Sequence, residues 1–385
     1  MGPAGERSGR QGGSRTRRGR QSHASLRPSL GRRLRTARPR DPSRGVSVIE
    51  RRRLVLVLIS LAAALAAAVA AATLLGSARL SPSDVLAVLT GHADASATES
   101  VVIWGVRLPR IAAAALAGGA LAVAGAGFQA LTRNPLAEPS VLGVSSGAAL
   151  GVVIGQLMGP AAGVADAVRL TMFGFAGALA AGLAVYFIAT TSAGLPVQTL
   201  LLAGVIVGMF FAAAITVITS LVDINRLGGI VHWLLGNVSA IPPRALAVFA
   251  LLGAVGFWLI AGQARQLNVL ALGEEAALQL GVNAERLKLR VFVGSALLTA
   301  CVVAFAGPIG FVGLIVPHSL RMVVGPDNRL LVPGALLGGA IFLLVADTLA
   351  RNVVAPAELS VGVLTSLCGA PFFIYLLRTR YRGGL

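Results

Sequence analysis

The stretch AAAALAGGALAVAGAG at residues 112–127 decides the fold class. It holds no charged side chain and consists only of alanine, glycine, leucine and valine. A helix needs about 20 mainly apolar residues to cross a bilayer. Small side chains let helices approach closely in lipid, where packing drives their association. GALLGGAIF at residues 334–342 is similarly rich in glycine and alanine and also holds no charged side chain. We therefore expect a tightly packed bundle of membrane-spanning helices.

The composition of the whole chain supports this expectation. Of its 385 residues, 56% are hydrophobic and 12% are charged, whereas soluble proteins usually have about 25% charged residues. This balance excludes an ordinary soluble enzyme, a secreted mini-protein and a disordered chain. The two cysteines, Cys301 and Cys368, lie far apart in apolar stretches. We expect them to be inert thiols. The sequence predicts neither a disulfide framework nor a cysteine metal site.

The sequence predicts an all-α membrane domain with ten spanning helices over residues 54–385. The segment at 310–324 is short, so we expect it either to be buried by neighbouring helices or to be broken. The expected spans are 54–76, 108–130, 141–159, 167–190, 198–222, 244–264, 289–307, 310–324, 331–350 and 359–378.

Residues 1–53 differ from the rest of the chain. They hold 16 of the 33 basic residues, are rich in Gly, Ser and Pro, and have no apolar period. This composition predicts a disordered cytoplasmic tail. Electrostatic binding of anionic lipid or nucleic acid and a targeting peptide are weaker alternatives, and we expect no nucleic-acid partner. Arg51, Arg52 and Arg53 abut the first span and place the N-terminus inside; an even number of spans places the C-terminus there too.

The chain lacks the common signatures of catalysis. Lys288 is the only lysine, and Arg286 and Leu287 precede it, so the sequence has no P-loop. It also has no HExxH and no GxSxG motif. We expect neither an enzyme nor a resident metal or cofactor. No acidic residue lies in the middle of an expected span, which disfavours a stand-alone secondary transporter. Asp347 and Arg351 are four residues apart and can pair on one helix face.

Three loops carry recognisable patterns. They are RNPLAEPSVLGVSSG (133–147), LALGEEAALQLGVNAERLKLR (270–290) and GLIVPHSLR (313–321). From the residues alone, the first is a capped turn or a polar break. The second predicts a short surface helix between glycines, which is either a solvated connector or a docking element. His318 in the third is a structural residue rather than a metal ligand.

These loops also resemble a known family. The stretches 107–151, 270–282, 307–321 and 346–377 are similar to permease subunits of FecCD-type (type II) ABC importers for iron chelates, haem and vitamin B12. The resemblance runs from about residue 54 to 380. It implies ten helices, a second permease subunit (a homodimer), two cytoplasmic ATPase subunits that bind ATP and Mg²⁺, and an extracytoplasmic substrate-binding protein. It also implies residence among the lipids of a bacterial or archaeal cytoplasmic membrane.

The resemblance further implies roles for individual residues. It predicts a permease that moves a metal chelate, with a ferric siderophore as the first candidate, and vitamin B12 or haem as alternatives. Three arginines would face outward and pair with glutamates of the binding protein: Arg107, Arg110 and Arg351. The ATPase-coupling loop would comprise Gly273, Glu274, Glu275, Ala276, Leu280 and Gly281. The cytoplasmic gate would lie at Val197 and Gln198. A structural loop motif would comprise Asn134, Pro135, Glu138, Pro139, Gly143, Pro317, His318 and Arg321.

Overall fold

The computed structural model describes residues 42–76, 80–91, 98–159, 164–192, 194–354 and 357–382. In these ranges the chain is helical, apart from turns and one isolated bridge between Thr191 and Gly194. Its contacts divide the chain into a unit at residues 1–47 and a main unit at 48–385. Most of the expected tail lies outside the described residues. Helix α1 (Pro42–Leu74) begins before residue 54, where we expected the first span to start.

Seven helices among the described residues are long and apolar enough to cross a membrane. The second of them runs without a break through α3 (Thr98–Ser100), the π-helical segment η1 (Val101–Arg107) and α4 (Leu108–Thr132). The other six are α1, α6 (Val164–Ala189), α7 (Val197–Leu221), α9 (Pro243–Ala261), α12 (Ala284–Ala306) and α14 (Asn328–Asn352).

Three further apolar helices coincide with the remaining expected spans but are shorter. They are α5 (Val144–Leu157), α13 (Val312–Val324) and the apolar part of α15 (Val361–Arg382). Each expected span thus overlaps an apolar helix, and the count of ten crossings stays a prediction. The connecting pieces are α2 (Pro82–Leu89), η2 (Pro139–Leu142), α8 (Ile224–Leu234), α10 (Ala264–Leu270) and α11 (Glu274–Gln279).

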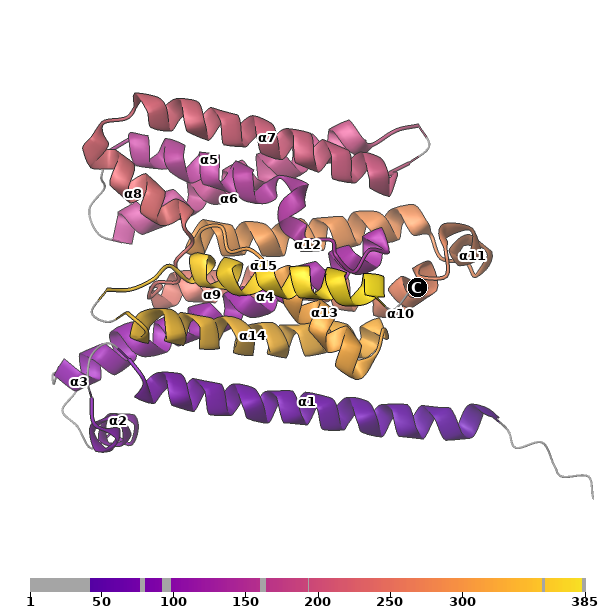
Figure 1. Ribbon diagram of the computed structural model, residues 1–385, viewed down its shortest axis with the longest axis horizontal. Coiled ribbons are helices and arrows are strands. Elements are labelled where there is room, and N and C mark those ends of the chain that lie inside the picture. The colour runs from indigo at the N-terminus through magenta and orange to yellow at the C-terminus, as the bar shows by residue number, and fades with distance from the viewer. Residues whose placement is uncertain are drawn as a thin grey trace, which may run out of the picture. The chain divides into compact units, whose positions relative to one another are not determined.

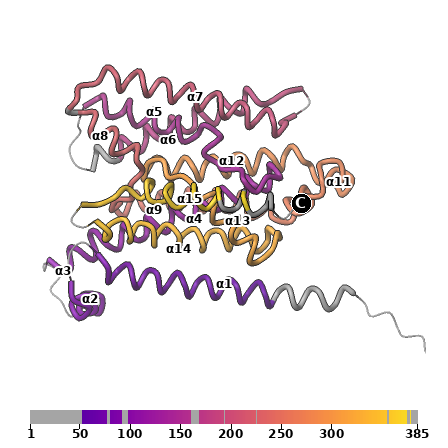
Figure 2. Tube along the Cα trace, viewed as in Figure 1, coloured from indigo at the N-terminus to yellow at the C-terminus, as the bar shows by residue number. Residues whose placement is uncertain are grey.

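Helix α4 is the centre of the bundle. It packs on α9, α12, α13 and α14, while α5, α6 and α7 pack on one another along one side (Figure 1). Tracing the chain shows α12 running between these two groups (Figure 2). Most of the α4 side chains are buried, as the alanine- and glycine-rich stretch predicts.

Two glycines in α4 allow this close packing. A Cβ atom on Gly118 would overlap the carbonyl oxygen of Gly339 in α14, and a Cβ on Gly125 would overlap the carbonyl oxygen of Gly313 in α13. Backbone therefore meets backbone at both crossings, which is the contact that small residues permit in membrane bundles.

Helix α13 is the short segment that we expected to be buried or broken. Its residues from Val312 to His318 are buried, so neighbouring helices enclose its first turns. It begins after Phe311, whose φ of 68° lies in the left-handed region. The Phe311 N–H donates a hydrogen bond of 2.7 Å to Oε1 of Glu138. The prediction of burial is confirmed.

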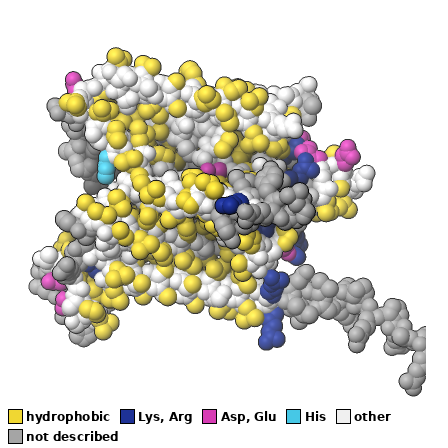
Figure 3. Space-filling view, in the orientation of Figure 1, with side chains coloured by type: hydrophobic (Ala, Val, Ile, Leu, Met, Phe, Trp, Pro, Cys, Tyr) yellow, Lys and Arg dark blue, Asp and Glu magenta, His cyan; other side chains and the backbone are white. Residues whose placement is uncertain are grey.

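The surface of the bundle is largely apolar. Large hydrophobic side chains on α6, α7 and α9 are exposed, including Phe187, Phe210 and Trp258. Figure 3 shows hydrophobic side chains spread over the helices in view, with several charged groups gathered at the end that carries α11. A surface of this kind is stable in lipid and not in water. The chain is a multi-pass membrane protein.

Candidate functional site

The loop between α10 and α12 forms the short helix that the sequence predicts. Gly273 precedes α11 with a φ of 117°, and Gly281 follows it with a φ of 78°. Both angles favour glycine, because a Cβ atom is strained in that region. The loop stands at one end of the bundle (Figure 1). Leu278 and Leu280 are 61% and 64% exposed. Exposed leucines on a short helix of this kind are typical of a surface that binds another protein.

An ion-pair network around one buried lysine anchors this loop. Nζ of Lys288, in the first turns of α12, lies 2.9 Å from Oε2 of Glu274 and 3.1 Å from Oε1 of Glu285. The Lys288 side chain is only 3% exposed, whereas the two carboxylates are more than a third exposed. The lysine therefore joins α11 to α12. Sequence reasoning noticed Lys288 only as a missing P-loop residue and did not find this role.

The same network reaches the segment before α7. The Leu195 N–H donates a hydrogen bond of 2.6 Å to Oε2 of Glu285. Gly194 has a φ of 100°, and a Cβ atom there would lie 2.5 Å from the carboxyl carbon of Glu285. The expected gate residues follow directly: Val197 begins α7 half-buried, and Gln198 is exposed. Glu285 thus contacts the segment before α7 through Oε2, and Lys288, which also holds Glu274 of the α11 loop, through Oε1.

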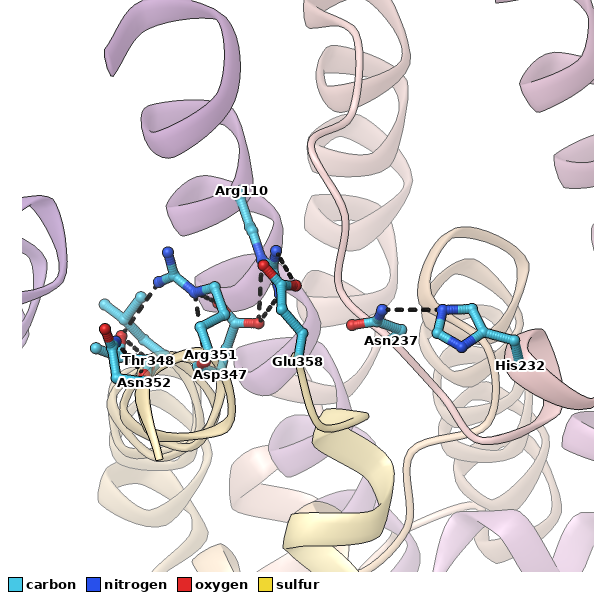
Figure 4. A network of polar contacts seen from close by, with 9 residues as sticks. Arg110, His232, Asn237, Asp347, Thr348, Arg351, Asn352 and Glu358 are labelled. Atoms are coloured by element: carbon cyan, nitrogen blue, oxygen red, sulfur yellow. Dashed lines mark hydrogen bonds and ion pairs between the residues drawn. The ribbon is translucent and has the colours of Figure 1, made fainter. Parts of the chain in front are cut away.

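A second ionic cluster lies where the first turns of α4 meet the last turns of α14 (Figure 4). Nη2 of Arg110 lies 3.0 Å from Oδ1 of Asp347, and its Nη1 lies 2.9 Å from Oε2 of Glu358. Nε of Arg351 lies 3.1 Å from Oδ2 of Asp347. The pairing of Asp347 with Arg351 on one helix face is confirmed. Arg107 donates a hydrogen bond of 2.7 Å to the carbonyl oxygen of Thr73.

The three arginines that we expected to face outward are buried within this chain. Arg107, Arg110 and Arg351 are all less than 10% exposed, and the Asp347 side chain is fully buried. Two guanidinium groups share the Asp347 carboxylate, so the charges are compensated inside the protein and tolerate burial. Sequence reasoning missed Glu358, whose residue type alone does not reveal a partner on α4. Whether the arginines also contact a binding protein stays a prediction.

The loop motif links α4 to α13. Asn134 accepts a hydrogen bond of 2.9 Å from the Leu136 N–H, and Glu138 holds the start of α13 as described above. Burial raises the pKa of the Glu138 carboxyl above its usual value. Arg321 donates a hydrogen bond of 3.1 Å to Oε1 of Gln129 near the end of α4. These contacts indicate a structural role.

The other members of the motif fit the same role. Pro139 begins η2, and Gly143 follows it with a φ of 72°. Pro135 lies in the turn between Asn134 and Glu138. Pro317 lies inside α13, and the His318 ring is buried within 6.3 Å of the Phe373 ring. Among the described residues, no group of three or more His, Cys, Asp or Glu side chains could hold a metal ion.

Comparison with known proteins decides the family. The FecCD transport family model matches residues 63–379. This chain belongs to the FecCD transport family. Relatives from this family cover most of its length. The hemin transport system permease protein HmuU of Yersinia pestis is 45% identical over 277 residues, covering 71% of this chain and 83% of HmuU. The cobalamin import system permease protein BtuC of Halobacterium salinarum is 43% identical over 286 residues, covering 74% of this chain and 75% of BtuC.

A solved structure shows the same fold. It is described as an inward-facing conformation of a metal-chelate type ABC transporter, and its chain is 31% identical. The TM-score is 0.73, with 84% of this chain and 99% of that chain covered. Membership of the FecCD family, the fold and the apolar surface together make this chain an ABC transporter permease.

Proposed function

We propose that this chain is the permease subunit of an importer that carries a metal chelate from a substrate-binding protein into the cytoplasm. A ferric siderophore is the first candidate, and vitamin B12 and haem are the alternatives. The relatives' names support this range, since they include cobalamin, hemin and iron(3+)-hydroxamate systems. The chain would lie in a bacterial or archaeal cytoplasmic membrane with both termini inside.

The single observation that carries the proposal is the exposed α11 loop within a FecCD family fold. Its two glycines fix a short helix, and its leucines face solvent. We propose that Gly273, Glu274, Glu275, Ala276, Leu280 and Gly281 form the surface where an ATPase subunit docks. The working assembly would hold two permease subunits and two ATPase subunits. ATP and Mg²⁺ would bind to the ATPase, and this chain would supply the pathway.

We propose that the buried arginine cluster helps to dock the substrate-binding protein, at the end of the bundle away from α11. It joins the start of α4, the end of α14 and the segment before α15. Glu358 is its most exposed member. A docking protein with its own carboxylates would compete with Glu358 for Arg110. Such exchange would set the register of the binding protein more than its affinity.

The docking of the ATPase can be tested directly. We expect the chain, purified in mild detergent from its native membrane, to carry an ATPase subunit with a P-loop, identified by mass spectrometry. Replacing both Leu278 and Leu280 by Glu should release that subunit, because charged groups would replace the apolar contact. Val353→Glu is the matched control. Val353 is about as exposed as the two leucines, but it lies at the C-terminal end of α14 and not on the α11 loop.

Two results would count against the proposal. If the intact chain purifies without any ATPase, a stand-alone carrier becomes the better reading. If the double variant keeps as much ATPase as the Val353→Glu control, the ATPase docks elsewhere and the role of α11 is lost.

A further inference from the structure

We propose that Lys288 is a positioning residue that carries the displacement of α11 to the first turn of α7. This inference rests on the proposed function, because it assumes that an ATPase moves α11. It goes further by assigning the path inside the permease: from Glu274 through Lys288 and Glu285 to the backbone of Leu195. We call these four residues the Lys288 relay.

The first link of the relay joins α11 to α12. Both contacts of the Lys288 ammonium are charge-assisted, at 2.9 Å and 3.1 Å. The ammonium is almost fully buried, so breaking either contact would leave a buried charge less compensated. Such a loss is unfavourable enough to make the partners move together. A displacement of Glu274 therefore displaces the start of α12.

The second link joins α12 to the segment before α7. The bond from the Leu195 N–H to Glu285 is short, at 2.6 Å, and its acceptor is a carboxylate. Gly194 lets the backbone come this close, since any side chain there would collide with Glu285. Pro196 then fixes the backbone into α7. Helix α7 packs chiefly on α5, α6 and η2. The hydrogen bond from Leu195 to Glu285 therefore gives α12 a direct contact with the segment that leads into the first turn of α7.

Charge explains how one buried lysine holds the carboxylates of Glu274 and Glu285 together. The two carboxylates face each other across the ammonium, and each is partly exposed to solvent. Without the ammonium they would repel each other and turn toward water, and α11 would lose its polar tie to α12. The backbone would survive this change, because neither carboxylate would be left buried. The relay is thus separable from the fold.

The experiment follows the gate segment in the assembled transporter. Cys301 and Cys368 are replaced by alanine, and Gln198→Cys provides a single thiol at the start of α7. The rate at which a water-soluble maleimide modifies this thiol is measured with and without Mg²⁺-ATP and orthovanadate. We expect nucleotide to change the rate by about tenfold, the size of an ordinary coupling between two sites.

Three variants separate the relay from general damage. Lys288→Met keeps the length of the side chain without its charge and should abolish the response to nucleotide. Lys288→Arg keeps the charge and should retain most of the response. Arg286→Met removes an exposed cation from the same helix and should respond like the background. If Lys288→Met does not assemble with the ATPase, Glu285→Gln replaces it, with the same expected direction.

The outcomes are distinguishable. A response in Lys288→Met that equals the background within twofold overturns the relay and leaves the proposed function intact. A background that binds the ATPase but shows no response overturns the relay as well, because the gate segment then does not move. Failure of the background to bind any ATPase overturns the proposed function and the relay together. Loss of the response in Lys288→Met, with Arg286→Met unaffected, supports the relay.

Discussion

Gly125→Ala is expected to disrupt the packing of the bundle. The added methyl group would overlap the carbonyl oxygen of Gly313, and a backbone atom cannot rotate away as a side chain can. Overpacked cores usually lose about 1–3 kcal/mol of stability, and we expect the upper end of this range because α4 and α13 must separate. The measurement is thermal unfolding of the purified chain in detergent, together with its elution volume.

Gly253→Ala is the control for this prediction. It lies on α9, and a Cβ atom there would meet nothing within 4 Å. Alanine is also the better helix former. We therefore expect the control to unfold at the temperature of the original protein or above it. Equal unfolding temperatures for the two variants would show that the contact of Gly125 with Gly313 is loose.

Arg110→Met is expected to have the other large effect. It removes one of the two guanidinium groups that compensate Asp347, and Arg351 alone would then face this fully buried carboxylate. Breaking a buried ion pair from one side typically destabilises a protein by about 3–5 kcal/mol. Thermal unfolding in detergent measures the loss.

Glu358→Gln is the matched control, because it removes a charge from the same cluster at its exposed edge. Exposed ion pairs contribute about 0–1 kcal/mol, so this variant should unfold close to the original temperature. If Arg110→Met proves as stable as Glu358→Gln, the cluster does not hold the start of α4 on the end of α14.

The features that could be predicted from sequence are local ones. Apolar length located the seven long apolar helices and three shorter ones, and the glycines at 273 and 281 delimited α11 correctly. The spacing of Asp347 and Arg351 revealed their pairing. Each of these signals lies within a few residues and depends on the period of a helix.

The features that were missed depend on partners far away in sequence. Arg110 meets Asp347 across 237 positions, and Glu285 meets Leu195 across 90. No local pattern distinguishes an arginine that faces water from one that faces a buried carboxylate on another helix. The resemblance to the family suggested arginines that face outward, and it gave no sign of their buried contacts within the chain. The role of Lys288 was hidden for the same reason.

The use of a single lysine has a practical consequence for anyone who maps the assembly. Cross-linkers and labels directed at lysine need an accessible side-chain amine, and Lys288 is enclosed by two carboxylates in the described part of the chain. Any lysine-directed cross-link recovered from the complex would therefore report on its partner subunits. Reagents directed at carboxyl groups, for example at Glu358, or at the exposed thiol of Cys368 would be needed to place this chain.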